Sequence, residues 1–371
     1  MPSIRTNADV AARQAAAPIL SARDLTVDFK LEHGVMRAVD GVGFDVRRGE
    51  VLGIVGESGS GKSQILMAAM GLTAINGRCS GSVTFEGQEI LNASPEKLDK
   101  IRGSSMSMIF QDPMTSLNPY MRVVDQLTEV LVAHQGKSKA EAVDVAVEML
   151  ERVRIPDARR RILLYPHEFS GGMRQRVMIA MALLCKPALL FADEPTTALD
   201  VTVQAQILDL LNGLVHELNA AVVIVTHDLG VIARMCDRVI VLYGGRIMEE
   251  AAIDDLFENP RHPYSQGLMA ATPRLDDNTA HDLRTIPGSP RALAGKMSGC
   301  PFAPRCSARC AGRNAARMDS RSSCPPARAG CRGLYADRGP CCRPGVASQP
   351  SVLVNRDAVG SRTGRRSPPP P

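Results

Sequence analysis

The sequence feature that most restricts the fold is an eight-residue stretch, Gly-Glu-Ser-Gly-Ser-Gly-Lys-Ser, at positions 56–63. It fits G-x-x-x-x-G-K-[ST], the phosphate-binding P-loop. An apolar segment at 51–55 precedes it, and a helical pattern at 64–70 follows it. This order points backbone N–H groups and a helix N-terminus at a phosphate, which an ordinary glycine-rich turn does not explain. We expect Lys62 at the β- and γ-phosphates and the Ser63 hydroxyl on Mg²⁺. The expected phosphate-contacting residues are Gly56, Glu57, Ser58, Gly59, Ser60, Gly61, Lys62 and Ser63.

The surrounding sequence predicts an α/β core built around this loop. Residues 20–46 alternate between apolar and polar positions, which is typical of a small antiparallel sheet. Near-continuous apolar runs at 188–192 and 221–226 indicate strands buried on both faces, as in a parallel sheet. Helical periodicity fills an insert at about 112–175. The predicted fold class is therefore α/β: a P-loop core with a parallel sheet, an N-terminal antiparallel β-subdomain, a helical subdomain insert and a C-terminal extension.

Composition changes along the chain and suggests domain boundaries. From Arg291 onward there are 15 Lys and Arg but 3 Asp and Glu, whereas the rest of the chain has 29 and 36. The basic balance therefore belongs to the tail, and we expect no specific nucleic-acid binding by the main body. The predicted parts are a disordered N-terminal extension at 1–18, a nucleotide-binding domain at 19–255, a C-terminal extension at 256–310 and a basic Cys/Pro/Arg-rich tail, largely disordered, at 311–371.

Nothing in the sequence is typical of secretion or of membrane insertion. Residues 1–17 lack the apolar core of a secretory leader, and no stretch of about 20 apolar residues occurs. We therefore expect a reducing, cytosolic setting, in which clustered cysteines suggest metal ligands more than disulfides. Seven of the ten cysteines lie between Cys300 and Cys342.

A pair of carboxylates follows the first buried run. Asp193 and Glu194 come directly after residues 188–192, where a parallel strand directs its last side chains toward a ligand. Asp193 is a candidate Mg²⁺ ligand, and Glu194 is a candidate base for an attacking water. Two ordinary surface carboxylates are the alternative, and the upstream P-loop favours the catalytic interpretation.

Three further features are weaker when taken alone. Ser170, Gly171 and Gly172 precede a helical pattern and form either a second anion site or a common helix cap. His227 follows the strand at 221–226 and could bond a γ-phosphate, although a histidine there is usually structural or exposed. Phe29 lies in the alternating region, where an aromatic residue is often part of the core.

Together these motifs resemble the ATPase subunits of ABC transporters over about residues 20–275. The resemblance implies that Phe29 stacks on adenine, that Gln111 contacts Mg²⁺ and the attacking water, and that His227 senses the γ-phosphate. It also implies Walker A at 56–63, a nucleotide-contacting signature at Ser170–Gly172, Walker B at Asp193, the catalytic base at Glu194 and the D-loop at Ala198–Asp200. The signature reads Phe-Ser-Gly-Gly-Met rather than the common Leu-Ser-Gly-Gly-Gln, but the serine and both glycines remain.

Finer resemblance points to the oligopeptide and dipeptide importers, and among them to the D-type ATPase. The segments 108–119 and 165–176 carry it, together with His-Pro-Tyr at 262–264. In this branch the C-terminal extension can hold a [4Fe–4S] cluster. Residues 299–306 are similar to the start of that segment, but Arg313 stands where a third cysteine is expected. A cluster would use Cys300, Cys306, Cys310 and Cys324; a tail that binds nothing is the favoured alternative, and an altered reading frame would explain its composition.

The resemblance implies an ATPase that uses ATP and Mg²⁺ to power peptide import, or the import of nickel or another small solute. The expected partners are a second ATPase subunit, identical or different, two membrane permease subunits and an extracytoplasmic binding protein. The expected location is peripheral, on the cytoplasmic face of the bacterial inner membrane. Other classes fit less well. Translation ATPases normally join two such domains, DNA-repair ATPases contain a long coiled coil, and small-molecule kinases lack the signature and the D-loop.

Overall fold

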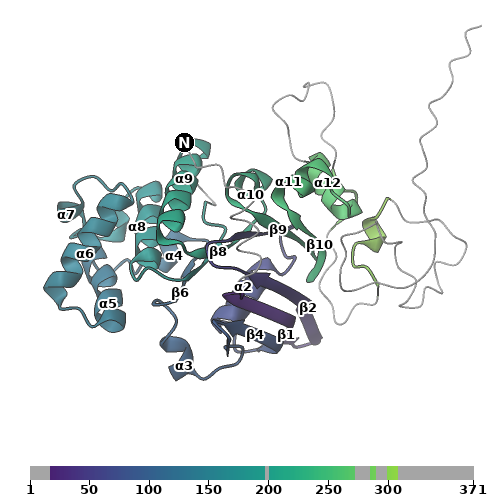
Figure 1. The fold of residues 1–371 in the computed structure, drawn as a ribbon, viewed down its shortest axis with the longest axis horizontal. Coiled ribbons are helices and arrows are strands. Elements are labelled where there is room, and N and C mark those ends of the chain that lie inside the picture. The colour runs from purple at the N-terminus through teal and green to yellow at the C-terminus, as the bar shows by residue number, and fades with distance from the viewer. Residues whose placement is uncertain (1–16, 197–199, 272–284, 290–298, 308–371) are drawn as a thin grey trace, which may run out of the picture. The chain divides into compact units, whose positions relative to one another are not determined.

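The computed structural model describes residues 17–196, 200–271, 285–289 and 299–307, and Figure 1 shows their arrangement. The N-terminal part is a four-stranded antiparallel sheet in the order β2-β1-β4-β5. In the register of its three long strands, Val27 pairs with both Val39 and Cys79. The predicted antiparallel β-subdomain is thus confirmed. Its strands are β1 (Leu20–Leu31), β2 (Gly34–Val46), β4 (Gly77–Phe85) and β5 (Gln88–Glu89).

The second sheet has six strands in the order β10-β9-β3-β8-β7-β6. Five of them are parallel, and β10 alone is antiparallel because the turn at Gly244–Gly245 reverses the chain after β9. The central strands are buried at every position, so their sequences lack polar alternation. The strands are β3 (Val51–Val55), β6 (Met106–Ile109), β7 (Leu189–Asp193), β8 (Ala221–Thr226), β9 (Arg238–Tyr243) and β10 (Arg246–Ala252).

Both faces of this sheet are covered, and alternate side chains enter two different cores. Leu52 and Ile54 pack with α2 (Lys62–Met70) and the β-subdomain. Val51 and Val55 belong to the other core, which includes side chains from three helices. These helices are α8 (Gly171–Leu183), α9 (Val201–Leu218) and α10 (Leu229–Met235). Both faces of β3, the strand that precedes the P-loop, are therefore held by apolar packing.

Helices predominate between β6 and β7, and Figure 1 shows α5, α6 and α7 grouped away from the antiparallel sheet. A capping box in which Ser138 and Glu141 bond each other's backbone fixes the start of α6. The helices before β7 also include a short one ahead of β6. Besides α2 and α8, they are α3 (Pro95–Asp99), α4 (Pro113–Ser116), α5 (Val123–Gln135), α6 (Lys139–Arg152), α7 (Ala158–Arg161) and a 3₁₀ turn at Pro166–Glu168.

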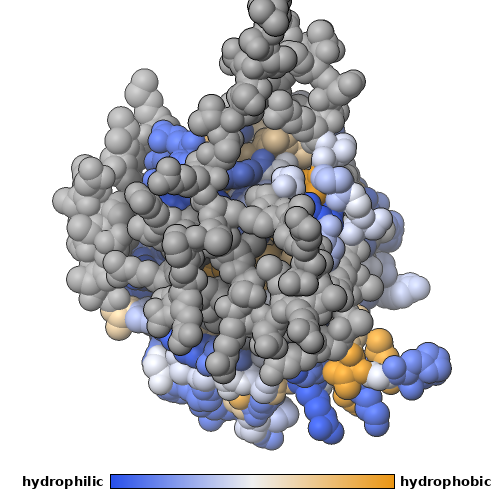
Figure 2. All heavy atoms as spheres, turned by 90° about the vertical axis from the view of Figure 1, so that its right-hand side faces the viewer, coloured by the Kyte–Doolittle hydropathy of each residue, from blue (hydrophilic) through white to orange (hydrophobic). Residues whose placement is uncertain are grey.

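After β10 the chain forms α11 (Ile253–Glu258), α12 (Pro263–Ala271) and a 3₁₀ turn, η2 (Ala303–Arg305). Where described residues are visible on the face in Figure 2, hydrophilic ones predominate and hydrophobic ones form small separate groups. No helix in the described ranges combines the length and apolar character needed to cross a membrane. Several predictions fall outside the described residues: the extension at 1–16, two D-loop positions at 198–199, and the tail from 308 with Cys310 and Cys324.

Candidate functional site

The site lies where neighbouring parallel strands end. The strands β3, β8, β7 and β6 are adjacent and run in the same direction, so their carboxyl ends share one edge of the sheet. The P-loop follows β3, His227 follows β8, Glu194 follows β7, and Gln111 lies just after β6. Residues from four distant parts of the sequence therefore converge on one place, as ligand sites do in α/β sheets.

The P-loop is packed closely against β9 and β2. A Cβ atom added at Gly56 would lie 2.1 Å from the Leu242 carbonyl oxygen, and one at Gly61 would lie 2.2 Å from the Ala38 carbonyl oxygen. Gly61 has φ 99° and is the N-cap of α2, and no side chain caps this helix. The N-terminal N–H groups of α2 thus meet no capping side chain, which suits an anionic ligand.

Lys62 is held inside this loop with only 5% of its surface exposed. Its Nζ donates to the carbonyl oxygens of Gly56 at 2.8 Å and Glu57 at 3.0 Å. Burial lowers the pKa of Lys62, and the nearby carboxylates of Glu194, Asp193 and Glu57 act in the opposite direction. The buried Ser60 hydroxyl has no hydrogen-bond partner within the described part of the chain. A buried amine and an unpartnered hydroxyl fit a phosphate group.

Asp193 lies beside the start of α2. Ser63 Oγ donates to Asp193 Oδ1 at 2.9 Å, which joins the two predicted Mg²⁺ ligands. Asp193 is 4% exposed; burial raises its pKa, and the Ser63 hydrogen bond opposes this effect. Among the described residues no group of three or more His, Cys, Asp or Glu side chains could hold a metal ion. Few protein ligands are nevertheless expected for Mg²⁺, which keeps waters and binds substrate phosphates.

Glu194 is held between two other candidate catalytic residues. Gln111 Nε2 donates to Glu194 Oε2 at 2.9 Å, and His227 Nδ1 lies 3.0 Å from Glu194 Oε1. Glu194 has φ 46°, a conformation that residues other than glycine seldom adopt, and its N–H donates to the Val225 carbonyl at 2.8 Å. The backbone thus turns sharply at the end of β7, in the manner of functional positions that store strain.

Two glutamines that were not predicted from the sequence support this edge of the sheet. Gln175 is buried in α8 and donates through Nε2 to the Pro195 carbonyl, next to the carboxylate pair. Gln204 Nε2 donates to Asp228 Oδ2 at 2.9 Å, and Asp228 caps α10 directly after His227. A buried amide on an apolar helix is the sequence signal that could have identified Gln175.

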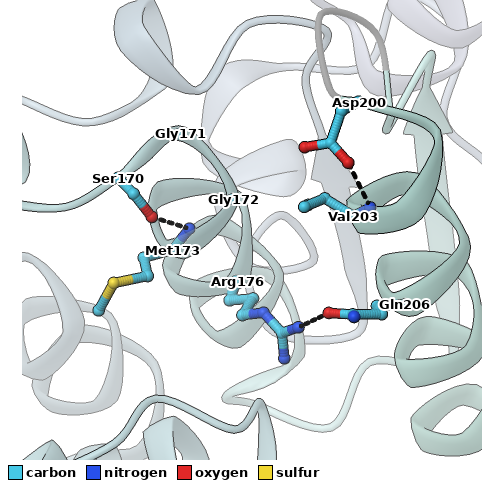
Figure 3. Close-up of a pocket in the computed structure, with 8 residues that line it drawn as sticks. All are labelled: Ser170, Gly171, Gly172, Met173, Arg176, Asp200, Val203 and Gln206. Atoms are coloured by element: carbon cyan, nitrogen blue, oxygen red, sulfur yellow. Dashed lines mark hydrogen bonds between the residues drawn. The ribbon is translucent and has the colours of Figure 1, made fainter.

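The signature residues line a separate pocket, shown in Figure 3. Ser170 caps α8 by accepting from Met173 N–H at 3.4 Å, and Asp200 caps α9 by accepting from Val203 N–H at 2.9 Å. Two helix N-termini therefore border the pocket. No P-loop residue is among those that line it: Ser170, Gly171, Gly172, Met173, Arg176, Asp200, Val203 and Gln206. Among the described residues, the P-loop therefore does not contribute to the pocket that the signature lines.

Phe29 is 8% exposed and lies in the core of the β-subdomain. A Cβ atom added at Gly77 would lie 3.0 Å from its ring. This burial agrees with the core interpretation of Phe29, and adenine stacking by the same ring stays a prediction. Ser58 and Gly59, in contrast, are exposed at the tip of the P-loop.

Comparison with known proteins identifies the family. The ABC transporter family model matches residues 39–197, and the model for the oligopeptide/dipeptide transporter C-terminal region matches residues 248–312. The chain is 59% identical over 295 residues to the oligopeptide transport ATP-binding protein OppD of Salmonella typhimurium, covering 80% of this chain and 88% of that protein. It is 48% identical over 291 residues to OppD of Bacillus subtilis, covering 78% and 81%.

A solved structure agrees with this match. The dimeric ATP-binding cassette MJ0796 bound to ADP and Pi superimposes with a TM-score of 0.57 and 30% identity, covering 63% of this chain and 98% of that one. The chain therefore belongs to the ATP-binding proteins of ABC transporters, in the oligopeptide/dipeptide branch defined by its C-terminal region.

Proposed function

We propose that this chain hydrolyses ATP to power the import of oligopeptides through an ABC transporter. The observation that carries the proposal is the placement of Glu194, which is bonded to Gln111 and His227 at the sheet edge that also holds the P-loop. An α/β sheet with a P-loop can serve many reactions. A carboxylate fixed by an amide and an imidazole beside that loop is suited to activating a water molecule.

In this proposal each group has one task. Lys62 leaves the carbonyls of Gly56 and Glu57 and binds the β- and γ-phosphate oxygens. Ser63, Asp193 and Gln111 are the residues that would hold Mg²⁺, and the ion would neutralise phosphate charge. Glu194 takes a proton from water as the water oxygen bonds the γ-phosphorus and the bond to the β-phosphate oxygen breaks. His227 orients Glu194 and contacts the γ-phosphate.

The site requires a second ATPase subunit. The signature pocket lies apart from the P-loop in this chain, so a partner supplies Ser170–Gly172 or its equivalent to the P-loop here. The dimeric state of MJ0796 in complex with ADP and Pi supports this arrangement. ATP bound between the subunits favours the closed dimer, and hydrolysis reopens it. The partner is either a copy of this chain or a related chain, and co-purification from native membranes identifies it.

We further propose a peripheral location on the cytoplasmic face of the bacterial inner membrane, with two permease subunits and an extracytoplasmic binding protein as partners. The relatives are named for oligopeptide transport, and the C-terminal match extends the similarity beyond the ATPase domain. This favours peptide over nickel as the solute. Closure of the dimer would move the segment after Gln111 against the permeases.

The deciding experiment is uptake by a strain that lacks this chain. Labelled oligopeptides, labelled dipeptides and labelled nickel are offered to cells carrying wild-type protein, Glu194→Gln protein or no protein. We expect peptide uptake with wild-type protein only, and equal nickel uptake in all three strains. Restored nickel uptake with unchanged peptide uptake would instead assign the alternative solute.

The cysteines have no step in this proposal. Cys300 and Cys306 are described, and Cys300 Sγ lies 3.9 Å from His262 Nε2, whereas Cys310 and Cys324 lie outside the described residues. Within the described ranges no three cysteines are gathered. A [4Fe–4S] cluster on Cys300, Cys306, Cys310 and Cys324 is tested by iron and acid-labile sulfide analysis of anaerobically purified protein, and we expect neither in stoichiometric amount.

A further inference from the structure

Two segments of the C-terminal extension contact the second residue of the P-loop, Glu57. The Tyr264 hydroxyl, from α12, accepts a hydrogen bond from Glu57 N–H at 3.0 Å. Arg305, from η2, binds both carboxylate oxygens of Glu57: Nη1 lies 2.7 Å from Oε2 and Nη2 lies 3.1 Å from Oε1. The extension is therefore joined directly to the loop that receives the phosphates.

The guanidinium of Arg305 is fixed by more than its pairing with Glu57. Its Nε donates to the Pro287 carbonyl at 2.9 Å, and Nη2 also lies 3.2 Å from the Ile286 carbonyl. Nη1 lies 3.3 Å from the Tyr243 hydroxyl, and the side chain is 7% exposed. A bidentate pair with a buried guanidinium is directional, unlike a fully exposed ion pair, which contributes little.

The Tyr264 hydroxyl is held in place by aromatic packing. Tyr264 is fully buried, and its ring centroid lies 4.7 Å from that of Tyr243 and 5.1 Å from that of Phe302. Tyr243 ends β9, α12 contains Tyr264, and Phe302 precedes η2. Burial raises the pKa of Tyr264, so the hydroxyl stays protonated at neutral pH. Packing among β9, α12 and the residue before η2 thus fixes the position of the Tyr264 hydroxyl oxygen.

Glu57 is also a partner of Lys62, since its carbonyl oxygen accepts from Lys62 Nζ at 3.0 Å. If Lys62 turns to a triphosphate, this bond is released, while the bonds to Tyr264 and Arg305 do not involve the amine. We propose that Tyr264 and Arg305 are positioning residues for nucleotide binding, which hold Glu57 and the first turn of the P-loop in place when Lys62 engages ATP.

This inference rests on the proposed ATPase function and adds a role for the extension. If docking of the extension strengthens ATP binding, then ATP binding must strengthen docking of the extension by the same factor, because coupling between two sites is reciprocal. ATP binding should therefore protect the docked extension, and loss of the docking contacts should weaken ATP binding.

The test measures the Kd for ATP with the purified full chain, in wild-type and variant forms. Tyr264→Phe removes the acceptor oxygen but keeps the ring packing, and Arg305→Ala removes the pair with Glu57. We expect each to raise the Kd roughly 10-fold, within the usual range of coupling between sites. In the reconstituted complex the same variants should raise KM for ATP and leave kcat near the wild-type value. Arg305→Lys keeps the positive charge but not the two parallel N–H groups of the guanidinium. Its Kd for ATP should lie between those of the wild type and Arg305→Ala.

Arg246→Ala is the matched control. Arg246 Nη1 donates to the Gly299 carbonyl at 2.9 Å and Nε to Asp40 at 2.6 Å, so it anchors the same extension through contacts other than Glu57. We expect this variant to lower the melting temperature and leave the Kd for ATP unchanged. A rise in Kd equal to that of Arg305→Ala would show a general structural effect and overturn the inference.

Hydrogen exchange provides a second measurement that does not require every variant to fold well. ATP should slow amide exchange at residues 262–266 and 300–306 of the wild-type chain, and this protection should be lost in Tyr264→Phe. Wild-type affinity for ATP in Tyr264→Phe, or ATP-independent exchange in the wild-type extension, would refute the inference alone. Failure of the wild-type chain to bind ATP would instead refute the proposed function, and the inference with it.

Discussion

Replacing Glu194 by glutamine removes the proposed base with little change in shape. The carboxylate oxygens contact two neighbouring side chains: Gln111 Nε2 lies 2.9 Å from Oε2, and His227 Nδ1 lies 3.0 Å from Oε1. A glutamine at 194 can keep both bonds. Its oxygen accepts from one partner, and its amide donates to the other after Gln111 rotates its own amide or His227 changes tautomer. Fold and hydrogen bonding are therefore expected to survive the substitution.

Because these contacts are retained, the change in kcat reports the loss of the base alone. The variant loses general-base assistance, which is worth 10²–10⁴-fold, so kcat for ATP hydrolysis should fall by about that factor. This corresponds to roughly 3–5 kcal/mol of activation free energy. Binding should respond differently, because Glu194 is one of the negative charges near Lys62. Removing it reduces repulsion of the phosphates, so the Kd for ATP should stay the same or decrease.

The assay combines phosphate release by the reconstituted complex with ATP titration of the same sample. Glu194→Asp, which keeps a carboxylate on a shorter side chain, is the control and should retain an intermediate rate. An unchanged rate of phosphate release in Glu194→Gln would refute the assignment of the base. Loss of ATP binding together with activity would show that Glu194 acts by holding the site together.

Four other substitutions test the loop and the extension. Lys62→Ala should abolish peptide uptake; it also leaves the buried Gly56 carbonyl without this donor, at about 1–3 kcal/mol, so calorimetry should show a lower melting temperature. Gly61→Ala should abolish ATP binding in titrations because its Cβ would collide with a carbonyl oxygen 2.2 Å away, whereas Gly59→Ala, with φ 76° and nothing within 4 Å, should cost about 1–2 kcal/mol and keep binding. Burial lowers the pKa of His262 in the folded chain, so stability is complete above the ordinary histidine pKa of about 6.5 and falls as the pH decreases below it, where the unfolded chain takes up a proton more readily. His262→Asn, which can still accept from the following turn as His262 Nδ1 does, should flatten the melting-temperature profile between about pH 7.5 and 5.5.

Local chemistry explains which parts of the fold and site could be predicted from sequence. The strands at 51–55, 189–193 and 221–226 are buried at every position, so their largely apolar composition indicates their position in the sheet. Residues at the ends of parallel strands meet at one edge, which is why Asp193 and His227 could be placed near the P-loop. This rule predicts which residues lie near one another, but not which of their atoms form hydrogen bonds.

Contacts between distant segments could not be predicted in this way. The pairing of Arg305 with Glu57 spans 248 positions, and neither residue has a local pattern that distinguishes it from a surface charge. Phe29 shows the same limit, since an aromatic residue in an alternating strand is compatible with either core packing or stacking on a base, and its burial depends on β4 and Gly77. Tertiary packing decides which side chains of this kind become partners. Hydrophobic periodicity and secondary-structure propensity carry no information on it.

Two kinds of contact hold the P-loop of this chain in place. Lys62 satisfies its own charge with loop carbonyls, and these bonds must be exchanged for bonds to ATP. The contacts of Glu57 with the extension need no exchange, because they use its N–H and its carboxylate. Binding energy from ATP is then not consumed in ordering the loop, which is how preorganisation raises affinity. The extension thus acts on the nucleotide site through one residue, Glu57, by way of its N–H and its carboxylate, without contacting the reacting atoms.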